Sequence, residues 1–188
     1  MTHAAGTAAH SPYAEYYKCQ ALRKYLKSTI LHFTLFIRRI AMPEMKVERA
    51  LEVNASPRQL WDWMAAIENW PHWKPFIVSS SLVSGLPLEK GSKLRFKPKM
   101  GPAPINLTVR ISESDPPNRL AWSGGGPGLA AVHSFDFEDL GNDHTRIVTR
   151  EVFKGPAVWL LKLFVSQKNL EKLHEQWLEA FQKKAEEK

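Results

Sequence analysis

From about residue 77 to residue 154 the sequence alternates between strand-like segments and short breaks, which restricts the fold more than any other feature. The segments show the period-two alternation or the β-branched and aromatic content of strands. They are IVSSSLVS, SKLRFKP, INLTVRISES, NRLAWSG, AAVHSFDFED and TRIVTREVFKG. The breaks, among them GLPLEKG, DPPN and LGNDH, are rich in the Gly, Pro, Asn and Asp of hairpin turns. We therefore predict an antiparallel meander with one face buried.

The alternation also predicts which side chains that buried face carries. Apolar residues recur at every second position of a segment, and the positions between them face the other way. Arg110 has the parity opposite to that of Val109 and is expected to face solvent. The residues expected on the buried face are Leu94, Phe96, Ile105, Leu107, Val109, Ile111, Leu120, Trp122, Phe135 and Phe137.

Ahead of the meander, the sequence predicts one strand and two short helices. The segment MKVERALEV, residues 45–53, alternates like a strand. NASPRQL then contains a helix start, with Ser56 as N-cap, Pro57 at the first helical position and Gln59 completing a capping box. This helix should run to about Ile67, and the two prolines of NWPHWKP limit the next helix to a short turn.

The segment from about Pro156 to the end predicts one helix of roughly 30 residues. Its second half has a clean apolar stripe of Leu170, Leu173, Trp177 and Phe181. Its first half, AVWLLKLFV, is apolar nearly all round. A helix that is apolar on every side is either buried on more than one side or meets lipid.

Four tryptophans crowd the segment LWDWMAAIENWPHWKPF, residues 60–76. Such large rings suit a solid core, and they equally suit the wall of a cavity for an apolar small molecule. The residues are Trp61, Trp63, Trp70 and Trp73, and both interpretations stay open for each of them.

Length and charge restrict the classes of function. A chain of 188 residues suits one domain with an appendage, and its single cysteine, Cys19, excludes an internal disulfide and fits a reducing, cytoplasmic location. The formal net charge is +7, but residues 1–44 hold six basic residues against two acidic ones, a net of +4. No dense Lys/Arg stripe interleaves with aromatic residues in the remainder, so we expect no nucleic-acid partner.

We divide the chain into an extension, residues 1–44, and a domain, residues 45–188. The extension contains a basic amphipathic helix at about residues 22–40, too short to cross a bilayer. This helix could lie on an anionic membrane surface, act as a targeting segment or pack on the domain, or Met45 could be the true start. Its apolar face consists of Leu22, Leu26, Ile30, Phe33, Ile37 and Ile40.

The order of elements from residue 45 to residue 188 resembles the START-like, or SRPBCC, helix-grip superfamily, in its branch of polyketide cyclases, dehydrases and lipid transport proteins. The resemblance is most specific in VNASPRQLWDWMAAIENWPHWKP and in HSFDFEDLGNDHTRIVTREVFKG, which includes an E-x-F-x-G motif at Glu151, Phe153 and Gly155. It implies an α+β helix-grip fold: a curved antiparallel sheet of about seven strands wrapped on a long C-terminal helix, with two short helices after the first strand.

The resemblance also implies a mostly apolar cavity between the sheet and the C-terminal helix. We therefore predict binding of a hydrophobic or amphipathic small molecule, such as a lipid, an isoprenoid or a polyketide-like compound, without a cofactor. The residues expected to line the cavity are Trp61, Trp73, Phe96, Leu107, Val109, Trp122, His133, Phe135, Glu151, Phe153, Leu163 and Leu170.

His133 and Glu151 are the best polar candidates for that cavity. Both share the parity of apolar neighbours, and pairing of Glu138 with Arg146 across the turn would place them directly opposite each other. We expect the two side chains to come within hydrogen-bond reach. They could merely satisfy each other, or they could form the general acid/base pair of a cyclase or dehydratase, so the sequence leaves open whether the protein is an enzyme.

A metal centre is not predicted from the sequence. The chain lacks an H-E-x-x-H motif, and its seven histidines show no metal-like spacing. The glycine-rich SGGGPG joins two predicted strands rather than a strand and a helix, so it is a turn and not a phosphate loop.

Overall fold

The computed structural model describes Lys24, residues 42–100 and residues 103–187. The chain separates into two units, Met1–Ala41 and Met42–Lys188. The predicted amphipathic helix, apart from Lys24, lies outside the described residues, so its membrane or targeting role stays a prediction. The sheet, the core and the candidate site all belong to the second unit.

The elements of this unit follow the predicted order. They are β1 (Glu44–Val53), α2 (Pro57–Ala65), the 3-10 helix η1 (Ile67–Asn69), α3 (Trp70–Trp73), β2 (Ile77–Ser84), β3 (Lys93–Met100), β4 (Ala103–Pro104), β5 (Leu107–Asp115), β6 (Arg119–Gly126), β7 (Leu129–Gly141), β8 (His144–Lys154), α4 (Val158–Phe164) and α5 (Gln167–Glu186).

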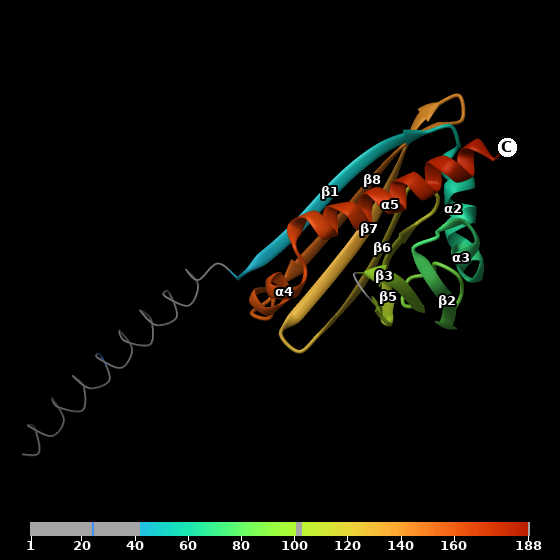
Figure 1. Cartoon of the computed structure of the whole chain (residues 1–188). Coiled ribbons are helices and arrows are strands. Elements are labelled where there is room, and N and C mark those ends of the chain that lie inside the picture. The colour runs from blue at the N-terminus through green and yellow to red at the C-terminus, as the bar shows by residue number, and fades with distance from the viewer. Residues whose placement is uncertain (1–23, 25–41, 101–102, 188) are drawn as a thin grey trace, which may run out of the picture. The chain divides into compact units, whose positions relative to one another are not determined.

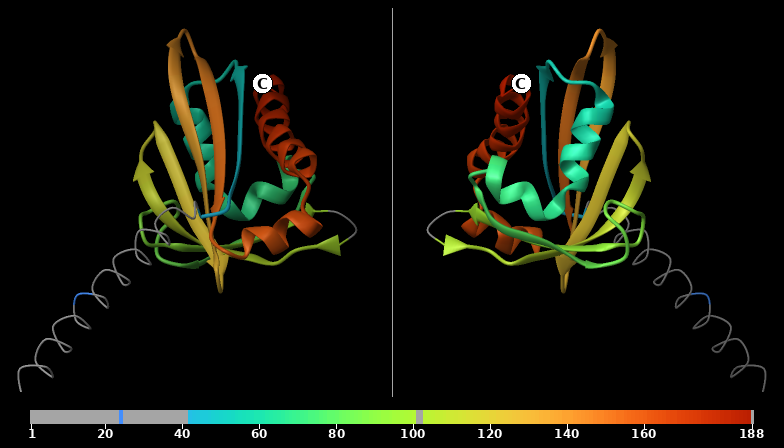
Figure 2. Two further views of the ribbon diagram at one scale, coloured as in Figure 1. Left: turned by 90° about the vertical axis from the view of Figure 1, so that its left-hand side faces the viewer. Right: turned by 90° about the vertical axis from the view of Figure 1, so that its right-hand side faces the viewer.

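The strands form one antiparallel sheet in the order β1-β8-β7-β6-β5-β3-β2, with β4 paired to β3 outside this path. Figure 1 shows α5 running beside β1, and Figure 2 shows the sheet bending from β1 and β8 round to β2 and β3 with α5 on its concave side. Arg49 on β1 ties the helix to the sheet through an ion pair with Glu171, 2.7 Å long. The α+β helix-grip prediction is confirmed.

The first helix begins where the sequence predicts. The Gln59 N–H donates to Ser56 Oγ at 3.4 Å, and the Ser56 N–H donates to Gln59 Oε1 at 3.1 Å, so both halves of the capping box are present. The helix ends at Ala65, slightly before the predicted Ile67, and η1 and α3 complete the turn into the sheet.

The long C-terminal helix is present as α5, but the predicted extent of roughly 30 residues from about Pro156 was wrong, because the segment breaks into α4 and α5. Val165 is extended, with φ −119° and ψ 106°, and Ser166 caps a new helix by accepting a hydrogen bond from the Asn169 N–H at 3.1 Å. The entry to α4 depends on Gly155, whose φ is +122°. A Cβ at this glycine would lie 2.2 Å from the Gly128 carbonyl oxygen, which explains the glycine that ends the E-x-F-x-G motif.

An aromatic core lies between the sheet and α5. Trp70 and Trp177 are buried with their ring centroids 5.6 Å apart, and the Trp70 indole N–H donates to the Met64 carbonyl oxygen at 3.0 Å. Of the predicted buried-face residues, all but two are buried: Leu107 is half-buried, and Ile105 is 44 % exposed. Ile105 differs because it lies in the connection between β4 and β5, where strand alternation does not apply.

Candidate functional site

A cavity of about 390 Å³ lies between the sheet and the helices α4 and α5. Most of its wall is apolar: Leu129 and Ala131 come from β7, Leu161 from α4, and Leu173 and Trp177 from α5. Seven of the side chains that the sequence predicts for a cavity lie in this wall. They are Phe96, Leu107, Val109, Trp122, His133, Glu151 and Phe153.

The other five predicted residues lie elsewhere. Trp61, Trp73 and Phe135 belong to the solid core, where Trp73 and Phe135 pack on Phe181 with ring centroids 5.2 and 6.3 Å away. Leu170 packs in a second cluster with Met45, Val47 and Val158. Leu163 is 77 % exposed, because the break before α5 turns its side of α4 away from the sheet. The tryptophans of residues 60–76 are therefore mainly core residues.

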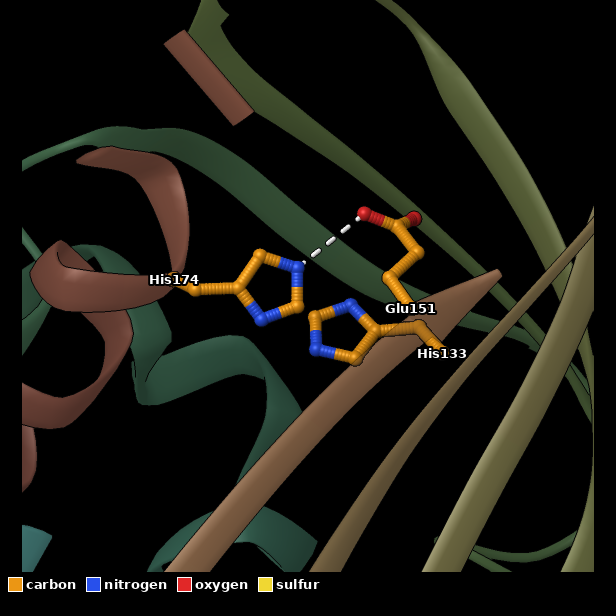
Figure 3. A group of neighbouring side chains, drawn as sticks. All are labelled: His133, Glu151 and His174. Atoms are coloured by element: carbon orange, nitrogen blue, oxygen red, sulfur yellow. Dashed lines mark hydrogen bonds and ion pairs between the residues drawn. The ribbon is translucent and has the colours of Figure 1, made fainter. Parts of the chain in front are cut away.

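The register between β7 and β8 is the predicted one, with Glu138 opposite Arg146 and His133 opposite Glu151. The expected direct hydrogen bond between His133 and Glu151 is nevertheless replaced by an indirect connection. Glu151 Oε2 lies 3.2 Å from Nε2 of His174 on α5, as Figure 3 shows. The His133 ring instead stacks on Phe135, with ring centroids 4.6 Å apart, and its Nε2 lies 2.8 Å from Thr149 Oγ1.

Thr149 completes a chain of four side chains, because its Oγ1 also lies 3.0 Å from His174 Nδ1. An ionised Glu151 only accepts, so His174 Nε2 carries a proton. In a neutral His174 the Nδ1 then accepts from the Thr149 hydroxyl, and the Thr149 oxygen accepts from the His133 Nε2–H. With this assignment every contact is a hydrogen bond between neutral histidines and their partners. Each group donates to the next one in the order His133, Thr149, His174 and Glu151.

Burial keeps the inner end of this chain uncharged. Desolvation lowers the pKa of His133 well below its usual range, and the neighbouring His174 and Lys74 lower it further. His133 and Thr149 are buried, whereas the Glu151 side chain is 14 % exposed and lies in the cavity wall. Glu151 and His133 therefore both border the cavity, whereas Thr149 and His174, which connect them, lie behind its wall.

His133, Glu151 and His174 also come close enough to be considered as metal ligands. One candidate ligand atom from each lies within 4.8 Å of the others, a proximity that the spacing of the histidines in the sequence did not indicate. The two imidazole rings, however, lie nearly face to face, with centroids 4.6 Å apart and planes at 32°. Nitrogen lone pairs of such rings do not converge on one point, and these nitrogens already make hydrogen bonds. The geometry suits a hydrogen-bonded chain better than a metal centre.

Sequence reasoning missed Thr149 and His174, although a signal for each was present. Thr149 has the same strand parity as Ile147 and Glu151. His174 lies four residues after Leu170 and three before Trp177, on the apolar stripe of the C-terminal helix. A polar residue on an apolar stripe is expected to face a polar partner in the core.

The family model for polyketide cyclase/dehydrase and lipid transport proteins matches residues 44–186. A START superfamily protein from Mycobacterium smegmatis is similar in structure, with TM-score 0.61, 16 % identity and coverage of 76 % of this chain and 97 % of that one. An aromatase/cyclase from Streptomyces sp. R1128 has TM-score 0.61 and 16 % identity over 77 % of this chain and 94 % of its own.

A third similar structure is norcoclaurine synthase from Thalictrum flavum in complex with dopamine and hydroxybenzaldehyde. It has TM-score 0.59 and 16 % identity over 80 % of this chain and 91 % of its own. At these identities the structures share the fold alone. A search of curated proteins found no match to the sequence. The match of the family model over most of the chain, together with the helix-grip fold, shows that the chain belongs to the polyketide cyclase/dehydrase and lipid transport family.

Proposed function

We propose that the domain binds a hydrophobic or amphipathic small molecule in the cavity between its sheet and α5. The observation that supports this most directly is the cavity itself: about 390 Å³, walled mainly by apolar and aromatic side chains, with Glu151 and His133 as its charged or titratable groups. Binding sites for small molecules combine these features, with few polar groups that orient the ligand. A lipid, an isoprenoid or a polyketide-like compound with a hydroxyl group that donates to the Glu151 carboxylate would fit this chemistry.

The cavity can be filled to test this proposal. Ala131 lies in the cavity wall, and Ala130 is exposed on the other face of the same strand. Ala131→Trp should abolish retention of apolar small molecules by the natively purified protein, whereas Ala130→Trp should retain them. Mass spectrometry of the extracted molecules measures both. Equal retention by the two variants, or none by the wild-type protein, would overturn the proposal.

A second candidate function is general acid/base catalysis, and the four-residue hydrogen-bonded chain favours it. Glu151 borders the cavity and could take a proton from a bound substrate. His174 holds the carboxylate in place, and Thr149 in turn holds the orientation of the His174 ring. The similar fold of an aromatase/cyclase shows only that this architecture accommodates such chemistry.

Substitution of Glu151 distinguishes a protein that only binds its ligand from an enzyme that converts it. Once a retained molecule is identified, Glu151→Gln should lower its conversion by about a hundredfold or more if the carboxylate is a general base. The matched control is Glu138→Gln, an exposed residue on β7. Binding without any conversion by the wild-type protein would leave the binding proposal standing and exclude the catalytic one for that molecule.

A further inference from the structure

Helix α4 exposes an unusual amount of apolar surface for its length. Four of its seven residues are large apolar side chains that face solvent. Trp159 is 72 % exposed, Leu160 59 %, Leu163 77 % and Phe164 77 %. Adjacent apolar side chains on one short helix form a continuous patch, and such patches mark interaction sites.

The opposite side of α4 is anchored to the domain. Val158 is buried against Met45, Val47 and Leu170, and Leu161 lies in the wall of the cavity. A helix that is apolar all round is either buried on several sides or in contact with lipid, and the sequence left both alternatives open. The structure buries only one side of α4, so contact with lipid is the alternative that remains for the exposed patch.

The charges beside the patch identify the kind of partner. From Lys154 to Leu170 the chain carries three lysines and no acidic residue, and one of the three, Lys154, pairs with Glu44 on β1 at 3.3 Å. Lys162 lies within the helix with its Nζ 6.0 Å from the Trp159 ring centroid, and Lys168 is exposed on the first turn of α5. Aromatic and leucine side chains with lysines beside them are typical of segments that lie in the interface of an anionic bilayer.

The sequence of residues 22–40 carries charge of the same sign as the surroundings of α4. That segment carries Lys24, Lys27, Arg38 and Arg39, of the same sign as the lysines around α4. Both segments are therefore attracted to anionic lipid. None of the described helices is long and apolar enough to span a bilayer, so contact through α4 would be peripheral.

We propose that α4 docks the domain on an anionic membrane surface by inserting Trp159, Leu160, Leu163 and Phe164. This inference goes beyond the proposed function and does not depend on what the cavity binds. Since Leu161 and Val165 border the cavity, docking through α4 places one side of the cavity wall next to lipid.

The test uses the full chain and vesicles of phosphatidylcholine with about one third phosphatidylglycerol. The wild-type protein should sediment with these vesicles, and less so with pure phosphatidylcholine or at high salt, because the lysines are screened. The fourfold variant W159S/L160S/L163S/F164S should lose about tenfold or more in partitioning, since each buried apolar side chain contributes at least about that factor. The substituted side chains are exposed, so the variant should unfold at the wild-type temperature.

Matched controls separate the patch from general surface apolarity. Leu86 and Leu140 are 64 % and 49 % exposed at other places in the domain, and L86S/L140S should bind vesicles like the wild-type protein. Equal vesicle binding by the fourfold variant would overturn the proposal and assign binding to another segment. Failure of the wild-type protein to bind vesicles would also overturn the proposal. If the wild-type protein is a dimer that binds no vesicles, and the fourfold variant is a monomer, the patch is a dimer interface instead.

Discussion

Lys74 is a lysine at a position where a hydrophobic residue would be expected. Its side chain is fully buried, and its Nζ lies 4.0 to 4.1 Å from the ring centroids of Trp70, Trp73 and Trp177 and 3.2 Å from Met64 Sδ. Burial lowers the pKa of Lys74 well below its usual range, whereas the three ring faces favour the charged ammonium. Lys74 lies behind the cavity wall. We therefore expect its substitution to change the stability of the fold rather than ligand binding.

We expect Lys74→Met to raise the melting temperature at pH 7. A lowered folded-state pKa means that, between that value and the unfolded value of about 10.4, the unfolded chain binds more protons than the folded one. Wild-type stability therefore rises with pH through this window, and methionine has no such dependence. The advantage of the variant should shrink as the pH approaches 10, measured by thermal unfolding at several pH values.

The exposed Lys183 provides the control, because Lys183→Met should leave the melting temperature and its pH dependence almost unchanged. A lower melting temperature for Lys74→Met at pH 7 would contradict the expectation. It would show that contact with the three tryptophan rings outweighs the desolvation of the ammonium.

At the scale of elements, a row of charges joins five strands on the outer face of the sheet. Arg150 on β8 pairs with Glu48 on β1 at 2.7 Å and with Asp136 on β7. Asp136 also pairs with Arg119 on β6, which reaches Glu113 on β5 at 2.6 Å. Hydrogen bonds to these two carboxylates raise the pKa of Arg119. A network in which one carboxylate serves two arginines is worth more than isolated surface pairs.

Asp136 is the central member of this network, with a side chain only 18 % exposed. We expect Asp136→Ala to lower the free energy of unfolding by about 1–2 kcal/mol, because it removes the carboxylate that Arg119 and Arg150 share and leaves each arginine with a single, more exposed partner. The comparison is Glu138→Ala, which removes an exposed single pair with Arg146 and should cost less than about 0.5 kcal/mol. Urea unfolding measures both, and equal losses would show that the network adds nothing beyond pairwise contacts.

At the scale of the whole molecule, residues 42–188 contain their own sheet, core and cavity. Just before β1, the Gly155 N–H donates to the Pro43 carbonyl oxygen at 3.2 Å. A protein beginning at Met42 keeps this bond and both hydrophobic clusters. We therefore expect it to unfold cooperatively within a few degrees of the full chain.

Differential scanning calorimetry of the two lengths checks this expectation. A fall of more than about 10 °C would exceed what a kcal/mol or two can explain in a domain of this size. It would mean that residues 1–41 contribute to the core, and it would weaken the case that the patch on α4 is free to meet lipid.

The sequence by itself determined the elements and their faces. Period-two alternation and turn residues predicted the meander, the capping box at Ser56 predicted the start of α2, and counting from Glu138 and Arg146 predicted that His133 lies opposite Glu151. These features are local, or they follow from a single hairpin, so that side-chain parity and turn chemistry are sufficient to specify them.

The tertiary structure alone decided how the faces meet. Thr149 and Glu151 lie 25 and 23 residues from His174, and only the path of α5 across the sheet brings them together. In the same way, the break at Val165 decided that Leu161 faces the cavity while Leu163 and Phe164 face outward. Periodicity states which residues share a face, but it does not state which other element covers that face, because that depends on packing between segments distant in the chain.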